Sequence, residues 1–133
     1  MKIVIPFFSS LFSMLVIDGV WLSLMAKRFY ATELSTLMAK NPQFLPAGIF
    51  YLIYTLALTF LVVIPGVQSH FSISKIFIYG ALFGLAAYAT YDLTNQATLK
   101  DWSILVTIVD LVWGTVLTGF VALIASIVTK HFA

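Results

Sequence analysis

Four long apolar runs restrict what this chain can fold into. We place them at about residues 3–26, 46–65, 74–96 and 102–129. Each run is close to the roughly 20 apolar residues that a helix needs to cross the hydrocarbon core of a membrane. Of the 133 residues, 62% are hydrophobic and 9% are charged, whereas charged residues make up about 25% of soluble domains. The sequence therefore predicts a membrane protein whose residues 1–133 form a single transmembrane domain.

Backbone polar groups inside a membrane must be paired within the chain, so we expect every run to be an α-helix. The predicted fold class is all-α, a polytopic bundle of four transmembrane helices. Pro46 suits the first turn of the second helix, and Pro65 with Gly66 predicts where that helix ends. The longest connection lies between the first two helices and contains RFYATELSTLMAK. Its apolar residues fall near helical spacing, which fits either a short interfacial helix or an ordinary loop.

Charge and composition exclude several classes of function. The chain has no cysteine, which excludes disulfides, thiolate metal sites and cysteine nucleophiles. Its basic residues are scattered near the ends of the runs and form no patch for nucleic acid, so we expect no nucleic-acid partner. The first run is longer than the roughly 7 to 15 apolar residues of a signal peptide, so we expect it to be retained as a span.

The loop charges are nearly balanced between the two sides of the membrane. An even number of spans puts both termini on one side and the long connection on the other. The basic residues are Lys2, Lys75 and Lys130 on the terminal side, and Lys27, Arg28, Lys40 and Lys100 on the long-loop side. Under the positive-inside rule this difference favours a cytoplasmic long loop. A dual topology stays open.

Two of the five acidic residues repeat one local pattern inside the apolar runs. The stretches IDGVWL and VDLVWG each place an aspartate three residues before a tryptophan, as Asp18–Trp21 and Asp110–Trp113. Asp18 lies eight residues before the expected end of the first span, and Asp110 lies eight residues after the expected start of the fourth. At roughly 1.5 Å per residue, both are expected about 12 Å below the long-loop edge. Asp92, four residues before the end of the third span, is expected in the same leaflet at about 6 Å.

Small and polar residues recur every four positions in three of the runs. The stripes are Ala47, Tyr51, Thr55 and Thr59 in the second run, Gly80, Gly84, Tyr88 and Asp92 in the third, and Asp110, Gly114, Thr118 and Ala122 in the fourth. Residues four apart share one face of a helix, and small residues on that face let membrane helices approach closely. We therefore expect these stripes, and with them the carboxyl groups, to face the interior of the bundle.

An ionised aspartate at the centre of a membrane helix costs about 2.5 to 3.5 kcal/mol on insertion scales. No Lys, Arg or His lies deep in a span to offset this charge. The three aspartates must therefore be protonated, hydrogen-bonded to neutral donors or neutralised by a bound cation. In the alternative interpretation, each aspartate only joins two helices by a hydrogen bond. The residues that we expect to form a ligand site are Asp18, Trp21, Tyr51, Tyr54, Tyr88, Tyr91, Asp92, Asn95, Asp110 and Trp113.

The stretch YATYDLTNQATLKDW, residues 88–102, together with IDGVWL, PAGIFYLIY and VDLVWGT, resembles the pattern of a known family. That family is a bacterial one of small, four-helix predicted membrane proteins, catalogued only as a domain of unknown function. The resemblance covers nearly the whole chain and implies a multi-pass protein of the bacterial inner (plasma) membrane. It implies no activity. The family motifs fall on Asp18, Trp21, Pro46, Tyr51, Tyr54, Tyr91, Asp92, Asn95, Asp110 and Trp113.

Three functions stay open, and the sequence favours the first. The first is a carrier or binding protein for a proton, a cation or a small polar or cationic ligand, because intramembrane carboxylates mark such pathways and aromatic rings hold organic cations. The second is a lipid-modifying membrane enzyme, in which a metal site would be all oxygen and would suit Mg, Mn or Ca. The third is an accessory or structural subunit without a ligand. The sequence names no catalytic residue and no cofactor. The partners that it indicates are membrane lipids and a small ligand, and a homo-oligomer stays open.

Overall fold

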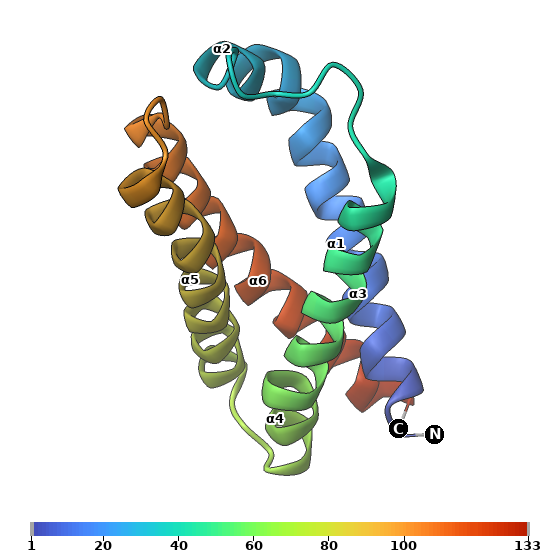
Figure 1. Cartoon of the computed structure of the whole chain (residues 1–133). Helices are drawn as coiled ribbons and strands as arrows, with labels where there is room; N and C mark the ends of the chain where they lie inside the picture. The colour runs from blue at the N-terminus through green and yellow to red at the C-terminus, as the bar shows by residue number, and fades with distance from the viewer. Residues whose placement is uncertain (1, 133) are drawn as a thin grey trace.

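The computed structural model describes residues 2–132, and all the regular secondary structure within them is helical (Figure 1). Its long helices are α1 (Val4–Met25), α3 (Phe44–Leu58), α5 (Ile73–Thr98) and α6 (Ile104–Phe132). Over these described residues, four helical stretches are long and apolar enough to cross a membrane. This confirms the predicted all-α fold with four transmembrane helices.

The first helical stretch continues beyond the expected end of the first span. A π-helical turn, η1 (Ala26–Tyr30), follows α1 directly and leads into the short helix α2 (Ala31–Glu33). The chain then leaves the helix through a turn at residues 34–37. The helical part of the long connection is therefore an extension of α1 and not a separate helix. Figure 1 shows that this extension bends over one end of the bundle.

The expected end of the second helix at Pro65 and Gly66 is wrong. A π-helical turn, η2 (Thr59–Val63), follows α3 and continues into α4 (Ile64–Gln68), so both residues lie inside the helical stretch. Proline has no N–H to complete the α-helical ladder and clashes with the preceding turn. A π-helical turn inserts one extra residue into that ladder. The wider turn just before Pro65 therefore lets the helix continue to Gln68.

The seam between α5 and α6 is built on glycines. Gly80 and Gly84 are buried against α6. A Cβ atom built on Gly80 would lie 2.6 Å from the Cβ of Ala122, and one built on Gly84 would meet the backbone oxygen of Gly114. Small residues let two membrane helices approach this closely. The predicted inward-facing stripes are therefore found on α5 and α6.

The stripe on α3 is only partly as predicted. Thr55 and Thr59 are buried and Tyr51 is half-buried, but Ala47 is exposed. The reason is visible in Figure 1, where α3 and α5 diverge toward the end that carries α2. The start of α3 is therefore not covered by α5, because α5 packs mainly on α6.

The helix α6 joins the two halves of the bundle. It packs along α5 and also against α1, whereas α3 packs mainly on α1. The apolar core at this junction is fully buried and includes Met14, Leu58, Val63, Leu117 and Val121. In Figure 1, α1 begins and α6 ends at the same end of the bundle, opposite α2. The α5 side and the α1–α3 side of the bundle are therefore held together mainly through α6.

We expect cysteines introduced at Ser35 and Lys100 to react from one face of the membrane, and those at His70 and His131 to react from the other. All four side chains are exposed, and the chain has no cysteine of its own to add background. Labelling with a membrane-impermeant maleimide in sealed vesicles measures this. Reaction of Ser35 and Lys100 from opposite faces would contradict the four-span arrangement, and mixed reaction at every site would indicate dual topology.

Candidate functional site

The two Asp-x-x-Trp motifs meet face to face between α1 and α6. The indole rings of Trp21 and Trp113 stack with their centroids 4.2 Å apart and their planes 9° from parallel. The Nε1–H of Trp113 donates a hydrogen bond of 3.0 Å to Oδ1 of Asp18. The Nε1–H of Trp21 donates at 3.1 Å to the Tyr30 hydroxyl, which itself donates at 2.5 Å to Oδ1 of Asp110. Each tryptophan is thus connected to the aspartate of the other motif.

The Asp18 carboxylate accepts hydrogen bonds on both of its oxygens. Besides the bond from Trp113, its Oδ2 accepts one from the Tyr51 hydroxyl of α3. Asp18 is buried, with 6% of its surface exposed. Hydrogen bonds to a charged acceptor are the stronger kind. Asp18 therefore joins α1, α3 and α6, and both of its partners are among the donors expected from the sequence.

Asp92, unlike Asp18, is buried without hydrogen bonds from neighbouring donors in the described residues. It is fully buried, with 0% of its surface exposed, and within residues 2–132 neither of its oxygens accepts a hydrogen bond from a hydroxyl, amide or ring N–H. Its neighbour is the carboxyl group of Asp110 on α6, and the two groups are close enough to interact electrostatically. Two carboxyl groups can share a hydrogen bond only when one of them carries a proton. The pair is therefore built to hold a proton or another positive charge.

The depth expected for Asp92 is too shallow. Because α5 ends at Thr98 and α6 begins at Ile104, Asp92 lies six residues before one helix end and Asp110 six residues after the other helix start. At 1.5 Å per residue both lie about 9 Å below the helix ends. The α5 helix ends two residues later than predicted, and α6 also begins two residues later than predicted. These two shifts bring the two carboxyl groups to the same level.

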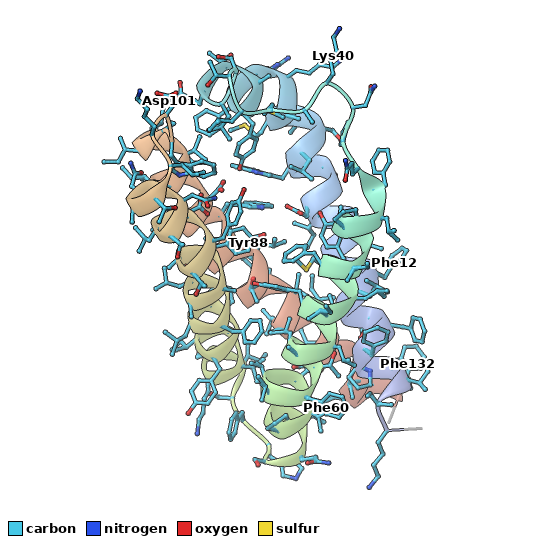
Figure 2. The ribbon with its side chains drawn as sticks, viewed as in Figure 1. Phe12, Lys40, Phe60, Tyr88, Asp101 and Phe132 are labelled. Carbon is cyan, nitrogen blue, oxygen red and sulfur yellow. The ribbon has the colours of Figure 1, made fainter. Side chains whose placement is uncertain are left out.

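Two cavities meet at Asp110. The first, of about 400 Å³, is lined by Phe50 and Tyr54 of α3, Ala87, Tyr88 and Tyr91 of α5, and Asp110. The second, of about 340 Å³, is lined by Asp18, Trp21, Leu22, Ala26, Tyr30, Leu34, Met38, Tyr88, Tyr91, Asp110 and Trp113. The two cavities share Tyr88, Tyr91 and Asp110. Figure 2 shows Tyr88 pointing from α5 into the interior of the bundle.

The remaining tyrosines expected in the site line at least one cavity, whereas Asn95 does not. Tyr54 and Tyr88 are inside it: the Tyr54 hydroxyl is 2.6 Å from Oγ1 of Thr118, and the Tyr88 ring makes an edge contact with the Tyr54 ring at 6.3 Å. Tyr91 lines both cavities but is largely exposed, with its ring edge-on to Trp102. Asn95 is half-buried one turn further along α5 and lines neither cavity.

Tyr30, which donates a hydrogen bond to Asp110, is not among the site residues predicted from the sequence. Tyr30 lies in η1, within the connection for which the sequence leaves both a short helix and a loop open. The π-helical turn and the bend of the chain place its hydroxyl beside α6, and Leu34 and Met38 reach the second cavity from the same connection. The only signal in the sequence is a tyrosine at the end of an apolar run, which is more often an interfacial anchor.

We expect Tyr30→Phe to lower the free energy of unfolding in detergent by about 1 to 2 kcal/mol, because it removes one hydrogen bond to a carboxylate and leaves the Trp21 indole without its acceptor. It should also shift the tryptophan emission. Tyr79→Phe is the matched control, since the exposed Tyr79 hydroxyl makes no side-chain hydrogen bond within residues 2–132, and it should change stability by less than about 0.5 kcal/mol. Equal changes in both variants would contradict the assigned role of Tyr30.

The fold and the site define a class: a multi-pass helical membrane protein with three carboxyl groups and stacked aromatic rings in one half of its bundle. Within residues 2–132, no group of three or more His, Cys, Asp or Glu side chains is arranged to hold a metal ion. The family model described as "Predicted membrane protein (DUF2177)" matches residues 3–127. The chain belongs to this family, as its motifs indicated. No curated protein and no solved structure matches the chain.

Proposed function

We propose that the protein binds a small cationic ligand at this site and exchanges it for a proton held between Asp92 and Asp110, as a carrier of the bacterial inner membrane. The observation that carries this proposal is the Asp92 carboxyl group. It is completely buried, no donor within residues 2–132 hydrogen-bonds to it, and its neighbour Asp110 lines two cavities. Leaving a buried polar group unpaired is costly, and more so when it is charged.

The charges around the site favour a cation over an anion. The sequence has no basic residue between Asn41 and Ser69, between Ile76 and Leu99, or between Asp101 and Thr129. Lys27 and Arg28, the nearest basic residues on the α1 extension, are exposed. Carboxyl groups within a membrane that lack a basic partner mark the pathways of protons and cations.

The aromatic rings support the same class of ligand. The second cavity is lined by the aromatic rings of Trp21, Tyr30, Tyr88 and Trp113 together with Asp110. A ring face attracts an organic cation by about 0.5 to 2 kcal/mol, with the larger values when water is excluded. A ligand with an amine or quaternary ammonium group could therefore contact a carboxyl group and a ring at once.

Native mass spectrometry of protein purified in a mild detergent tests this proposal. We expect the wild type to carry an additional small mass, Asp110→Asn to lose it, and Asp101→Asn to keep it. Asp101 is the control because it is an exposed aspartate in the α5–α6 loop, labelled in Figure 2 at the α2 end. A stoichiometric partner protein in place of a small mass would support the accessory-subunit alternative. The same spectrum reports whether the chain forms a homo-oligomer.

A further inference from the structure

The first cavity lies between α3 and α5, two helices that diverge toward the α2 end (Figure 1). Its lining residues are Phe50 and Tyr54 from α3, Ala87, Tyr88 and Tyr91 from α5, and Asp110 from α6. Apart from Asp110, every lining residue is aromatic or alanine. Such a surface offers little to a fully hydrated ion, whereas it suits an apolar chain.

The first cavity has one strongly exposed lining residue on each of its two walls. Phe50 and Tyr91 stand at its two sides, with 43% and 58% of their surfaces exposed. Phe50 lies six residues after the start of α3, and Tyr91 lies seven residues before the end of α5. At 1.5 Å per residue, these positions are about 9 to 10 Å below the helix ends. The opening is therefore at the depth of lipid chains and not at the water surface.

The second cavity offers a different environment on the other side of Asp110. It adds Asp18, Tyr30 and the stacked indoles of Trp21 and Trp113, and Leu34 and Met38 of the long connection also line it. A molecule that spans both cavities would meet carboxyl groups and ring faces at one end and an apolar wall leading to lipid at the other. The two cavities share Tyr88, Tyr91 and Asp110, so the boundary between these environments lies at Asp110.

We propose that the ligand is a single-chain amphiphile with a cationic amine or quaternary ammonium head, which enters from the lipid phase between α3 and α5. Its head lies at Asp110 beside Asp92 and the stacked indoles, and its chain occupies the first cavity and extends between Phe50 and Tyr91 into the lipid. This inference rests on the proposed cation site. It goes beyond that site by specifying the apolar chain and the lateral route.

Photolabelling in phosphatidylcholine nanodiscs tests the route. The probe is an alkyltrimethylammonium with a diazirine in the middle of its chain, and the adducts are mapped by mass spectrometry. We expect adducts to concentrate on Phe50, Ala87 and Tyr91, and not on the lipid-facing Phe12 and Phe120, which are also exposed. Adducts spread over all lipid-facing residues in proportion to their exposure would overturn lateral entry. The wild-type map decides this without any variant.

Two neighbouring alanines of α5 provide a matched pair of variants. Ala87 lines the first cavity, whereas Ala86 is exposed and lines a separate groove. Ala87→Leu should lower labelling at Phe50 and Tyr91 by about tenfold, equivalent to about 1.4 kcal/mol, and Ala86→Leu should leave it unchanged. Equal labelling in the two variants would overturn the route, with folding checked by the emission of the stacked tryptophans.

Tetramethylammonium, which has the same head but no chain, separates this inference from the proposed function. If it binds with loss of a proton while the alkyl probe does not label the entrance, the cation site is supported and the amphiphile is overturned. If neither compound binds, both proposals fail. If the alkyl probe labels the entrance and Asp110→Asn lowers that labelling by about tenfold, both are supported.

Discussion

Gly84→Leu is expected to leave little folded protein in the membrane. A Cβ atom at this position would meet the backbone oxygen of Gly114, and it would lie 2.6 Å from Oγ1 and 2.7 Å from Cβ of Thr118. A backbone atom cannot rotate away as a side chain can, so α5 and α6 would have to separate. Overpacking of this kind costs about 1 to 3 kcal/mol, and occasionally more. We expect a loss at the upper end of that range, because α5 has its main packing partner in α6.

The control for this variant is Gly48→Leu. Gly48 lies on α3, is exposed, and has no atom within 4 Å of the position that a Cβ would occupy. The added leucine would extend into lipid, where it is favourable by about 0.3 to 0.6 kcal/mol on insertion scales. Denaturation followed by tryptophan emission compares the two. Equal stability of Gly84→Leu and Gly48→Leu would contradict the assignment of the α5–α6 seam.

The seam could be predicted from the sequence because it depends on local periodicity. Gly80, Gly84, Tyr88 and Asp92 recur at intervals of four, as do Gly114, Thr118 and Ala122. A helix places such residues on one face whatever lies around it. Small residues on two helices then indicate that the two faces meet. The helical fold and the inward direction of Asp92 and Asp110 follow from the same periodicity.

The site itself depended on features that periodicity does not encode. The π-helical turns before Pro65 and at Tyr30 add a residue to the helix and change which side chains share a face. The prediction of a helix end at Pro65 and the omission of Tyr30 have this common cause. The separation of α3 from α5 results from packing among three helices, so neither the cavity nor the exposure of Ala47 could be read from any one of them.

Asp110→Asn is expected to weaken the binding of a cationic probe by at least about tenfold, equivalent to about 1.4 kcal/mol. Asp110 is the carboxyl group common to both cavities, and asparagine keeps its approximate shape while removing the charge. The Asp110→Asn variant should also lose the shared proton, because Asp92 no longer has a second carboxyl group beside it. Asp92→Asn removes that shared proton but leaves the Asp110 carboxyl group in the cavities. We therefore expect Asp92→Asn to retain probe binding and to lose its dependence on pH.

In the wild type, the sign of the pH dependence follows from competition between the proton and the cation. Lowering the pH keeps the proton on the carboxyl pair and should weaken cation binding, by at most about tenfold per pH unit for the exchange of one proton. Raising the pH should strengthen cation binding. The effect should level off at the pH where the carboxyl pair has already lost its proton before the cation binds. Isothermal titration calorimetry over a series of pH values measures the affinity of the wild type and of each variant for the alkyltrimethylammonium probe. Binding that strengthens as the pH falls would contradict the exchange.

Proton release on cation binding tests the exchange most directly. The alkyltrimethylammonium probe is added to purified protein in a weakly buffered solution containing a pH-sensitive dye. The wild type and Asp101→Asn should release about one proton per bound probe, because two adjacent carboxyl groups share a single proton. Asp92→Asn should bind the probe and release none. Probe binding to the wild type without proton release, or equal release from wild type and Asp92→Asn, would contradict the proposed role of the Asp92–Asp110 pair.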